Sequence, residues 1–530
     1  MDSDSALKTS TLSFEKMEAK ATTSARLTVA DNYVIRLKER QADPDRVFYD
    51  GEDLQHLDSM LVTLSVSDKE SPRCWTKAKK WRITMLLGAY TFFAPFASTI
   101  FAPSLKSVMA DLGETNPVRG ALQIGILLIA FALAPIFLAP LTERYGRRIV
   151  ISAGNIVFIL FCLGGGFAKS TAQLAVCRFF CGVGGSSSLS AYGGVLADLW
   201  SLKDRARASS AVGGILLLGP VFGPVCGGWI SELISWRWTC WVPAIAAALL
   251  EVIASFAYSE SHVPTLLRQK KRRLARKSRN ECYYTVLELA IDDIAKTKSV
   301  TMLLETVSRP LMYLFLDPAA ALLAVYYAFV FGILYLVIVT FQNVFGGLYG
   351  HSPGIVGVDF LSQGIGALIG MALSAWLLEL VYEKQMAKQP AAYKAESRLI
   401  CAFPGAFCVT AGLFLYGFSA GKTHFIVPMI GVSIFSIGQT NTYMAIQLYV
   451  IDSFDYPASA LASLSILRCL FAGVFPLFGE RLFDALGTDW GIGMLAFLTL
   501  GLGGPFLPLI YKFGPRLRSI GVKNRVKLLR

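Results

Sequence analysis

The stretch GALQIGILLIAFALAPIFLAPL, residues 120–141, carries a single polar side chain, Gln123, among its 22 residues. A helix rises about 1.5 Å per residue, so about 20 apolar residues cross the roughly 30 Å hydrocarbon core of a bilayer. Lipid offers the backbone no hydrogen-bond partners, and such a segment must therefore satisfy its own N–H and C=O groups as a helix. Residues 120–141 thus predict a transmembrane helix.

Eleven further stretches after residue 82 have the same character. The twelve predicted spans are 83–103, 120–141, 149–167, 173–199, 208–230, 238–258, 319–345, 354–381, 399–419, 424–452, 458–477 and 491–511. With 16% charged residues and a mean hydropathy of +0.51, the chain is too apolar for a large soluble protein with buried helices. The predicted fold class is an all-α membrane protein with twelve transmembrane helices.

A charged interval at 259–318 separates the spans into two sets of six. This arrangement predicts two similar six-helix bundles with a substrate site between them. The predicted divisions are a largely disordered N-terminal tail (1–82, with weak helix at 30–42), a first bundle (83–258), a central loop (259–318), a second bundle (319–512) and a C-terminal tail (513–530).

The formal charge of +13 is unevenly placed. Of the Lys and Arg residues, 42 fall in the two tails and the loops of one side, six fall on the other side, and Arg178 and Arg468 lie inside spans. The positive-inside rule then puts both termini and the central loop in the cytoplasm. Because the excess of Lys and Arg is concentrated in alternate loops, as expected of a topology signal, it excludes a nucleic-acid partner. The basic run at 268–279 is either part of this topology signal or a contact for anionic lipid headgroups.

Several function classes lack support. The first 80 residues contain no signal peptide, the ten cysteines form no CxxC pair, and the four histidines form no cluster, so we expect neither a metal site nor a cofactor. No constellation suggests an enzyme. The cytoplasmic segments contain no P-loop, and uphill transport would therefore have to use an ion gradient.

The loop APLTERYGRR, residues 139–148, places a glycine turn with one acid and three arginines between two spans. It resembles the signature G-x-L-x-D-R-x-G-R-R of the major facilitator superfamily, with Ala139 in place of Gly and Glu143 in place of Asp. Such a loop can act as a conformational latch that pairs in one state only; alternatively it is a static positive-inside anchor. The predicted latch residues are Glu143, Arg144, Gly146, Arg147 and Arg148, with Asp198 at the end of the fourth span.

Arg178 lies inside the fourth span, where a buried cation costs about 2.5–3.5 kcal/mol and needs a cavity or a partner. The resemblance continues here, because the superfamily carries R-x-x-x-G at this place, matched by Arg178 and Gly182, and links its arginine to proton coupling. The alternative is a hydrogen-bond hub that ties the fourth span to its neighbours.

The fifth span reads GPVFGPVCGG at residues 219–228. Glycines spaced by four share one helix face and permit close approach of another backbone, and each proline removes a backbone hydrogen bond. The run is similar to the G-P-x-x-G-G motif of drug:proton antiporters in the superfamily; the alternative is a tight helix crossing with no bearing on transport direction. The predicted antiporter face comprises Gly219, Gly223, Pro224, Gly227 and Gly228.

Further stretches narrow the resemblance to fungal twelve-span drug:proton antiporters: SWRW (235–238), ESRL (396–399), YVID (449–452), ASALA (458–462), LR (467–468) and FPLF (475–478). By depth in their spans, Glu251 and Asp359 join Arg178 as candidates for proton coupling. Polar and aromatic residues on apolar helices are candidates for the substrate path: Tyr326, Tyr327, Tyr335, Gln342, Asn343, Gln363, Gln439, Asn441, Tyr443 and Gln447.

The resemblance implies a secondary transporter that exports drugs, toxins or secondary metabolites in exchange for protons by alternating access. It also implies a multi-pass protein of the plasma membrane, with the vacuolar membrane as the alternative. We expect it to work as a monomer whose partners are the bilayer, protons and a small organic substrate. The remaining alternatives are a facilitator or importer of a small metabolite and a transporter-like membrane sensor.

Overall fold

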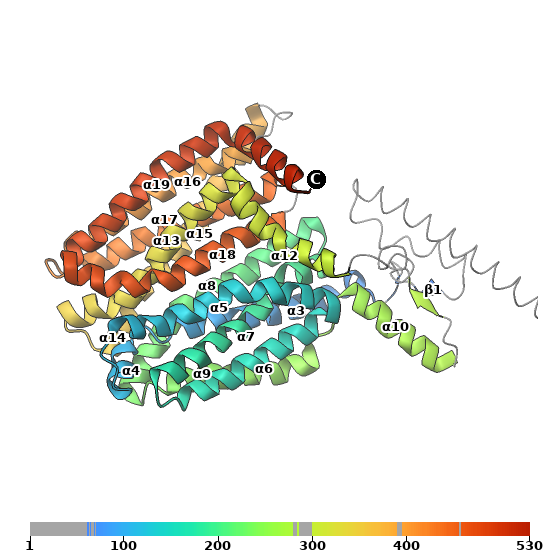
Figure 1. Ribbon diagram of the computed structural model, residues 1–530, viewed down its shortest axis with the longest axis horizontal. Coiled ribbons are helices and arrows are strands. Elements are labelled where there is room, and N and C mark those ends of the chain that lie inside the picture. Colours follow the sequence, from blue (N-terminus) through green and yellow to red (C-terminus); the bar gives the residue numbers. More distant parts are fainter. Residues whose placement is uncertain are drawn as a thin grey trace, which may run out of the picture.

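A computed structural model describes residues 61–62, 64, 68, 70–278, 283–285, 299–388, 395–454 and 457–529. Each of the twelve predicted spans falls on helix (Figure 1). The first bundle contains α3 (Lys77–Thr99), α5 (Pro117–Tyr145), α6 (Arg147–Gly166), α7 (Thr171–Leu199), α8 (Leu202–Leu233) and α9 (Trp238–Ala257).

The second bundle repeats this plan with more interruptions. Its members are α13 (Pro318–Phe341) with the π-helix η2 (Gln342–Leu348), α14 (Pro353–Asp359) with α15 (Leu361–Lys388), the 3₁₀ helix η3 (Ala395–Cys401) with α16 (Ala402–Ser419), α17 (Ile426–Ser453), α18 (Pro457–Val474) and α19 (Pro476–Leu529). In α19 the chain bends at Gly487, whose φ is +74°.

Two helices begin at a capping residue followed by proline. The Asn116 side chain accepts a hydrogen bond from the Val118 N–H, and the Asp317 side chain accepts from the N–H groups of Ala319 and Ala320. Proline at the first helical position needs no hydrogen-bond acceptor and has a helical φ. These local signals set where α5 and α13 start.

Among the described residues, eight helices are both long and apolar enough to cross a membrane. They are α5, α6, α8, α9, α13 with η2, α14 with α15, η3 with α16, and α19. The apolar part of α18, Ser459–Val474, is shorter, and α3, α7 and α17 contain more polar residues although they span 23, 29 and 28 residues. These four complete the set of twelve.

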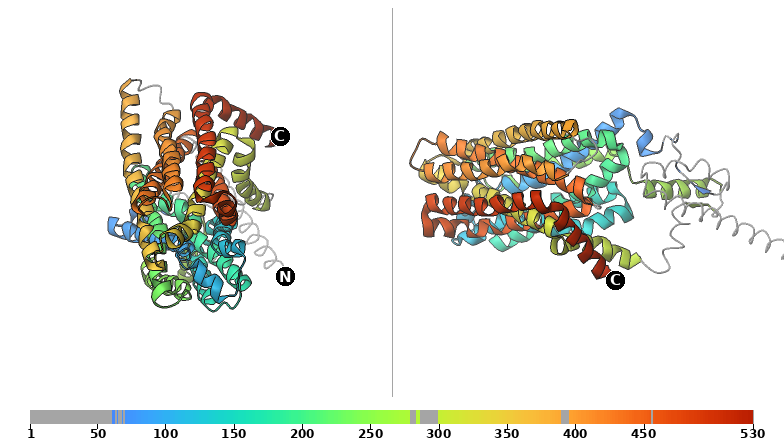
Figure 2. Two further views of the ribbon diagram at one scale, coloured as in Figure 1. Left: turned by 90° about the vertical axis from the view of Figure 1, so that its left-hand side faces the viewer. Right: turned by 90° about the horizontal axis from the view of Figure 1, so that it is seen from above.

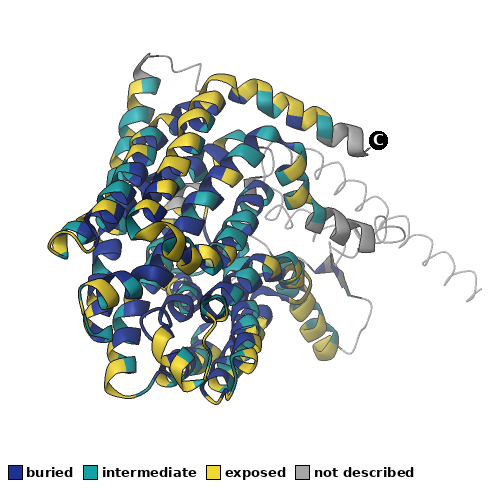
Figure 3. Cartoon of the chain, turned by 60° about the vertical axis from the view of Figure 1, so that its left-hand side comes forward, coloured by how far each residue is buried: buried dark blue, intermediate teal, exposed yellow. Residues whose placement is uncertain are grey.

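Many positions on the outer faces of the bundles are exposed (Figure 3), and a large number of exposed residues carry large apolar side chains. Phe256 is 89% exposed on α9, and Leu249 and Leu160 are about equally exposed, at 62% and 60%. A soluble protein seldom exposes such contiguous apolar surface, whereas a bilayer favours it. This surface marks the lipid-facing perimeter.

The molecule has two ends that carry different elements, called here the distal end and the proximal end (Figures 1 and 2). The distal end carries the short helices α4 (Leu105–Asp111) and α14 together with η2. The proximal end carries α10 (Val263–Ser278) and the last turns of α19. The bundles meet through α5 with α18 and through α8 with α14 and α15.

Segments predicted as tail and loop contain ordered elements at the proximal end. Strand β1 (Leu61–Val62) pairs in parallel with β2 (Tyr284–Thr285). Asp68 contacts Lys270 at 2.5 Å and Glu70 contacts Arg273 at 2.7 Å, so the tail also docks on α10. The central interval further contains α12 (Ser299–Leu316), and the 3₁₀ helix η1 (Pro72–Cys74) precedes α3. Residues 1–60, including the predicted weak helix at 30–42, lie outside the described residues.

Candidate functional site

The two bundles touch backbone to backbone in their distal halves. A Cβ added at Gly228 of α8 would collide with the Pro353 carbonyl oxygen of α14, and one at Gly125 of α5 would collide with the Gly473 carbonyl oxygen of α18. Only glycine permits this approach, since any side chain would occupy the space of the facing backbone. The distal half of the bundle interface is therefore closed by direct helix contact.

The predicted glycine–proline face on α8 also packs against α3 within the first bundle. A Cβ at Gly219 would lie 2.9 Å from the Phe92 carbonyl oxygen, and one at Gly227 would collide with that of Ile100. Gly223 faces Thr99 and the Phe96 carbonyl oxygen in the same way. Pro224 meets the second bundle, because its carbonyl oxygen lies against Gly357. The glycine–proline face of α8 therefore packs on two helices, α3 of its own bundle and α14 of the second bundle.

At the proximal end, the loop between α5 and α6 is tied by a carboxylate from a distant part of the chain. Gly146 has a φ of +104°, a conformation that side chains disfavour. The Glu260 side chain accepts hydrogen bonds from the N–H groups of Arg147 and Arg148, each at 3.0 Å, and so caps α6. A carboxylate is stabilised there by the helix dipole.

The predicted latch residues divide into two groups. Arg147 is buried, donates to Thr142 Oγ1 at 2.6 Å, and pairs with Asp198 at 3.5 Å between Nε and Oδ2. Glu143 and Arg144 are exposed. The structure therefore brings Arg147 and Asp198 together and leaves Glu143 on the surface.

The second bundle contains a matching ion pair. Arg398, at the start of the ninth span, approaches Asp452, at the end of the tenth, with 3.2 Å between Nε and Oδ2. Arg147 and Asp198 occupy the corresponding places in the third and fourth spans. Glu396 of the same ESRL stretch pairs with Arg518 of α19. The repeated six-span plan, together with the ESRL and YVID stretches, contained the signal for the Arg398–Asp452 pair, but corresponding positions of the two bundles were not compared.

Arg178 lies buried among backbone carbonyl groups. Its Nε donates to the Gln123 oxygen at 3.0 Å, Nη1 to the Ala97 oxygen at 2.7 Å and Nη2 to the Ser98 oxygen at 3.4 Å. Its guanidinium also lies 4.3 Å from the centre of the Phe101 ring. All three nitrogens are used in joining α7 to α3 and α5, as the hub alternative predicts.

Glu251 belongs to a polar cluster inside the first bundle. Its Oε2 accepts hydrogen bonds from the Tyr90 hydroxyl at 2.9 Å and from the Asn155 amide at 2.8 Å. The three residues come from α9, α3 and α6. Neither donor carries a charge, and no ion pair joins Glu251 to another described residue.

Asp359 lies at the distal end, where α14 meets α15. Its Oδ2 lies 2.7 Å from His351 Nδ1, and its side chain is 5% exposed. The His351 ring packs edge-on against Phe425 at 5.0 Å. Glu251 contacts residues of the first bundle and Asp359 contacts a residue of the second, so the two predicted coupling carboxylates form separate sites.

The predicted path residues do not form one cluster. Tyr335 bridges the bundles through a 3.2 Å contact with Ser98, whereas the Asn441 side chain is fully engaged with Ser374 and the Cys401 carbonyl oxygen, each at 2.8 Å. Buried members are Tyr326, Tyr327, Tyr335, Gln342, Gln363, Gln439 and Asn441; half-buried members are Asn343, Tyr443 and Gln447.

Three aromatic side chains surround a second arginine inside a span. The guanidinium of Arg468 lies 4.8 Å from the ring centre of Phe331, 5.7 Å from that of Tyr443 and 5.9 Å from that of Tyr327. The Tyr327 and Tyr443 rings stack with their centres 5.0 Å apart. Sequence reasoning noted the depth of Arg468 but did not assign it a role, since its aromatic neighbours are remote in sequence.

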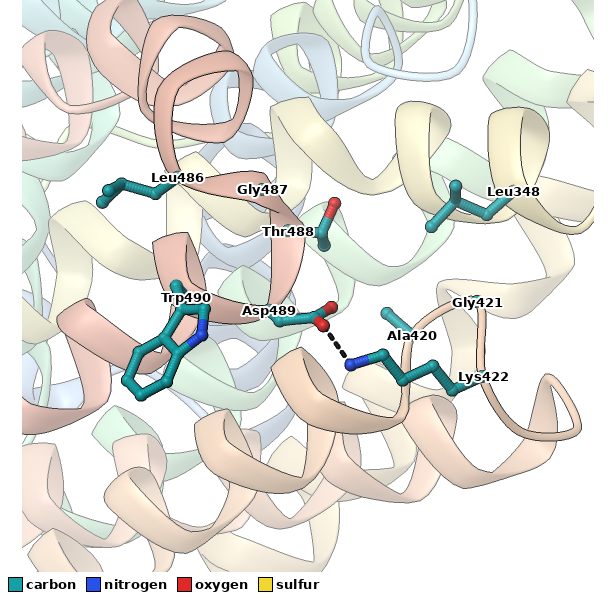
Figure 4. A pocket seen from close by; sticks show the side chains of 9 residues that line it. All are labelled: Leu348, Ala420, Gly421, Lys422, Leu486, Gly487, Thr488, Asp489 and Trp490. Carbon is teal, nitrogen blue, oxygen red and sulfur yellow. Dashed lines mark hydrogen bonds and ion pairs between the residues drawn. The ribbon is translucent and has the colours of Figure 1, made fainter.

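A pocket at the distal rim involves none of the predicted site residues (Figure 4). It lies among Leu348, the turn at Gly421 and the bend at Gly487, and its Lys422 and Asp489 side chains form an ion pair. Because its two charged groups neutralise each other, the pocket offers a ligand little electrostatic attraction.

Comparisons with protein families, with named proteins and with solved structures agree with one another. Residues 87–476 match the family model described as Major Facilitator Superfamily. The chain is 35% identical to the efflux pump vrtL of Penicillium aethiopicum, over 86% of this chain and 89% of that protein, and 33% identical to the efflux pump radE of Floropilus chiversii, over 91% and 86%.

Solved structures share the fold. A partially occluded inward-open conformation of the xylose transporter XylE from E. coli matches with a TM-score of 0.53 and 14% identity, covering 82% of this chain and 98% of that one. A bacterial homologue of the human lysosomal transporter Spinster, in an inward-facing conformation, matches with a TM-score of 0.55 and 16% identity, covering 86% and 96%.

Proposed function

Because the chain belongs to the major facilitator superfamily, we propose that it exports small organic compounds in exchange for protons by alternating access. Drugs, toxins and secondary metabolites are the expected cargo, and relatives named as efflux pumps support this direction of transport. The plasma membrane is the proposed location, with the proximal end and both termini in the cytoplasm. The distal end then faces outward, and the transporter acts as a monomer.

The observation that carries the proposal is the glycine–proline face of α8. It packs on α3 of its own bundle and on α14 of the other, with no room for a side chain at Gly227 or Gly228. A surface of this kind can open and reclose as a unit, because backbone packing has few alternative arrangements. Its sequence resembles the G-P-x-x-G-G motif of drug:proton antiporters, and this resemblance supports export as the direction of transport.

Glu251 is the proposed proton carrier. Its two uncharged donors leave it without a fixed counter-charge, whereas Asp359 already has His351 at 2.7 Å. A carrier must change protonation in each cycle, and Glu251 could do so without disturbing a second titratable side chain, whereas Asp359 is in contact with the His351 ring. Asp359 is assigned to the distal contact, where it fixes His351.

The test uses purified full-length protein in proteoliposomes, a panel of fluorescent dyes and an imposed pH gradient. The wild type is expected to concentrate at least one dye only while the gradient persists, and an ionophore that collapses the gradient should stop accumulation. Transport that ignores the gradient would identify a facilitator instead.

The Glu251→Gln variant refines this test. It should lose gradient-driven accumulation but retain exchange of labelled for unlabelled dye, because exchange needs no net proton movement. Asp359→Asn is the matched control, since it removes the other buried carboxylate. If Asp359→Asn alone uncouples transport, the carrier is Asp359.

A further inference from the structure

Arg178 and Arg468 lie inside spans of different bundles and differ in how their guanidinium groups are satisfied. All three nitrogens of Arg178 donate to carbonyl oxygens. The Nε of Arg468 is buried without a hydrogen-bond partner, and Arg468 forms no ion pair with any described carboxylate. Its guanidinium interacts with the Tyr327 and Tyr443 phenols and with the Cys469 thiol, and Tyr327 and Cys469 also hydrogen-bond to it.

A guanidinium group stays protonated in proteins, so Arg468 places a permanent charge inside the membrane region. Aromatic faces attract such a cation but do not neutralise it. A cation inside the membrane region without a counter-charge is costly even when it is only half-buried. An anion that binds and leaves would supply a counter-charge for Arg468.

The position of Arg468 suits a transported anion. The next residue, Cys469, packs with Ala94, Phe131 and Ala132 of the first bundle, so this turn of α18 lies where the bundles meet. Arg468 and Tyr443 are half-buried. On α17, Gln439 and Gln447 flank Tyr443 at four-residue spacing and thus share its helix face.

We propose that Arg468 with the rings of Tyr327, Phe331 and Tyr443, here named the Arg468 site, binds the anionic group of a planar organic acid. The planar fork of the guanidinium matches a carboxylate in a bidentate manner, and the rings provide faces on which an aromatic skeleton stacks. This assignment rests on the proposed function and adds a substrate class to it: aromatic carboxylates and phenolates.

The experiment compares two dyes with the same xanthene skeleton and opposite charge, fluorescein and rhodamine 123. Binding to detergent-purified full-length protein is measured by fluorescence anisotropy, and transport is measured in proteoliposomes under a pH gradient. The variants are Arg468→Gln, Arg468→Lys and Phe331→Leu. Arg178→Lys is the matched control, because it alters the other buried arginine. Size-exclusion profiles and melting temperatures show which variants fold.

The wild type is expected to bind fluorescein saturably, and Arg468→Gln should weaken that binding at least about tenfold while changing rhodamine 123 binding less than about twofold. Arg468→Lys should restore part of the affinity, because the charge remains and the fork is lost. Phe331→Leu should weaken fluorescein binding without reversing the charge preference. Arg178→Lys should leave the preference for fluorescein unchanged.

Three results would overturn the assignment: no saturable fluorescein binding by folded wild type, equal loss of both dyes in Arg468→Gln, or competition by chloride as effective as that by fluorescein. Failure of the proposed function looks different. In that case the wild type binds fluorescein in an Arg468-dependent manner, yet no dye accumulates in response to the pH gradient.

Discussion

Gly227 of α8 packs so closely on the Ile100 carbonyl oxygen that even a methyl group would overlap it. We expect Gly227→Leu to abolish transport while the protein still inserts into the membrane. Overpacking of this kind typically costs about 1–3 kcal/mol and would push α8 away from α3. Dye efflux from intact cells, at surface expression matched to wild type, provides the measurement.

Gly213 on the same helix supplies the control, because a Cβ there meets nothing within 4 Å. Gly213→Leu should therefore transport at close to the wild-type rate. Equal rates for Gly227→Leu and wild type would show that the α3–α8 contact does not need its close spacing.

Arg178→Ala should destabilise the first bundle by about 2 kcal/mol or more, because three buried carbonyl oxygens lose their donor. Thermal unfolding of purified protein measures this loss. Arg178→Lys should recover part of the stability, since one ammonium cannot reach all three oxygens. If Arg178 is a hydrogen-bond hub, stability and transport should fall together in Arg178→Ala. If that variant keeps its full stability but loses gradient-driven transport, Arg178 has a role in proton coupling instead.

Glu143 and Arg147 should respond differently to substitution. Arg147→Ala is expected to lower the melting temperature, because it removes the contacts with Thr142 and Asp198. Glu143 is exposed, so Glu143→Gln should leave the melting temperature unchanged and slow transport, as a latch that engages in another state would. Unchanged initial rates in Glu143→Gln would mean that this loop is only a static anchor.

The proximal loop should loosen in acid because of His262. Burial, with the charges of Arg147 and Arg268, lowers the pKa of His262 from 6.5 to about 4. Its neutral form is thus favoured in the folded loop, so stability is complete above pH 6.5 and falls as the pH drops towards 4. The protection of the Arg147 and Arg148 amides against hydrogen exchange, relative to the intrinsic exchange rate at each pH, should fall over this interval. His262→Asn should remove the pH dependence; the same dependence in both proteins would point to another group.

The sequence predicted the helices far better than the contacts between them. Apolar length alone located α5, and the spacing of Gly219, Gly223 and Gly227 correctly indicated a close helix contact. Local spacing could not show that Glu260 caps α6, because the two are 113 residues apart. It also could not separate Asn441, whose amide is engaged in packing, from Gln447 on the same helix.

Local sequence spacing also could not predict the strand pair at the proximal end. Two residues at Leu61–Val62 carry no periodic pattern of their own and become a strand only against Tyr284–Thr285. The segment is too short for propensity to decide its structure. Its docking on α10 through Asp68 and Glu70 depends on acids and bases about 200 residues apart, as 202 positions separate Asp68 from Lys270.

The long helix α19 returns to the start of its own bundle. Asn524 donates to the Leu316 carbonyl oxygen at 3.1 Å, and Gly521 packs on Asp317, the residue that caps α13. The first and last helices of this bundle are thereby fastened together, much as Glu260 fastens the first bundle through α6. A distance probe between two sites within either bundle should consequently stay constant through a transport cycle, and a probe placed across the bundles should alternate between two values.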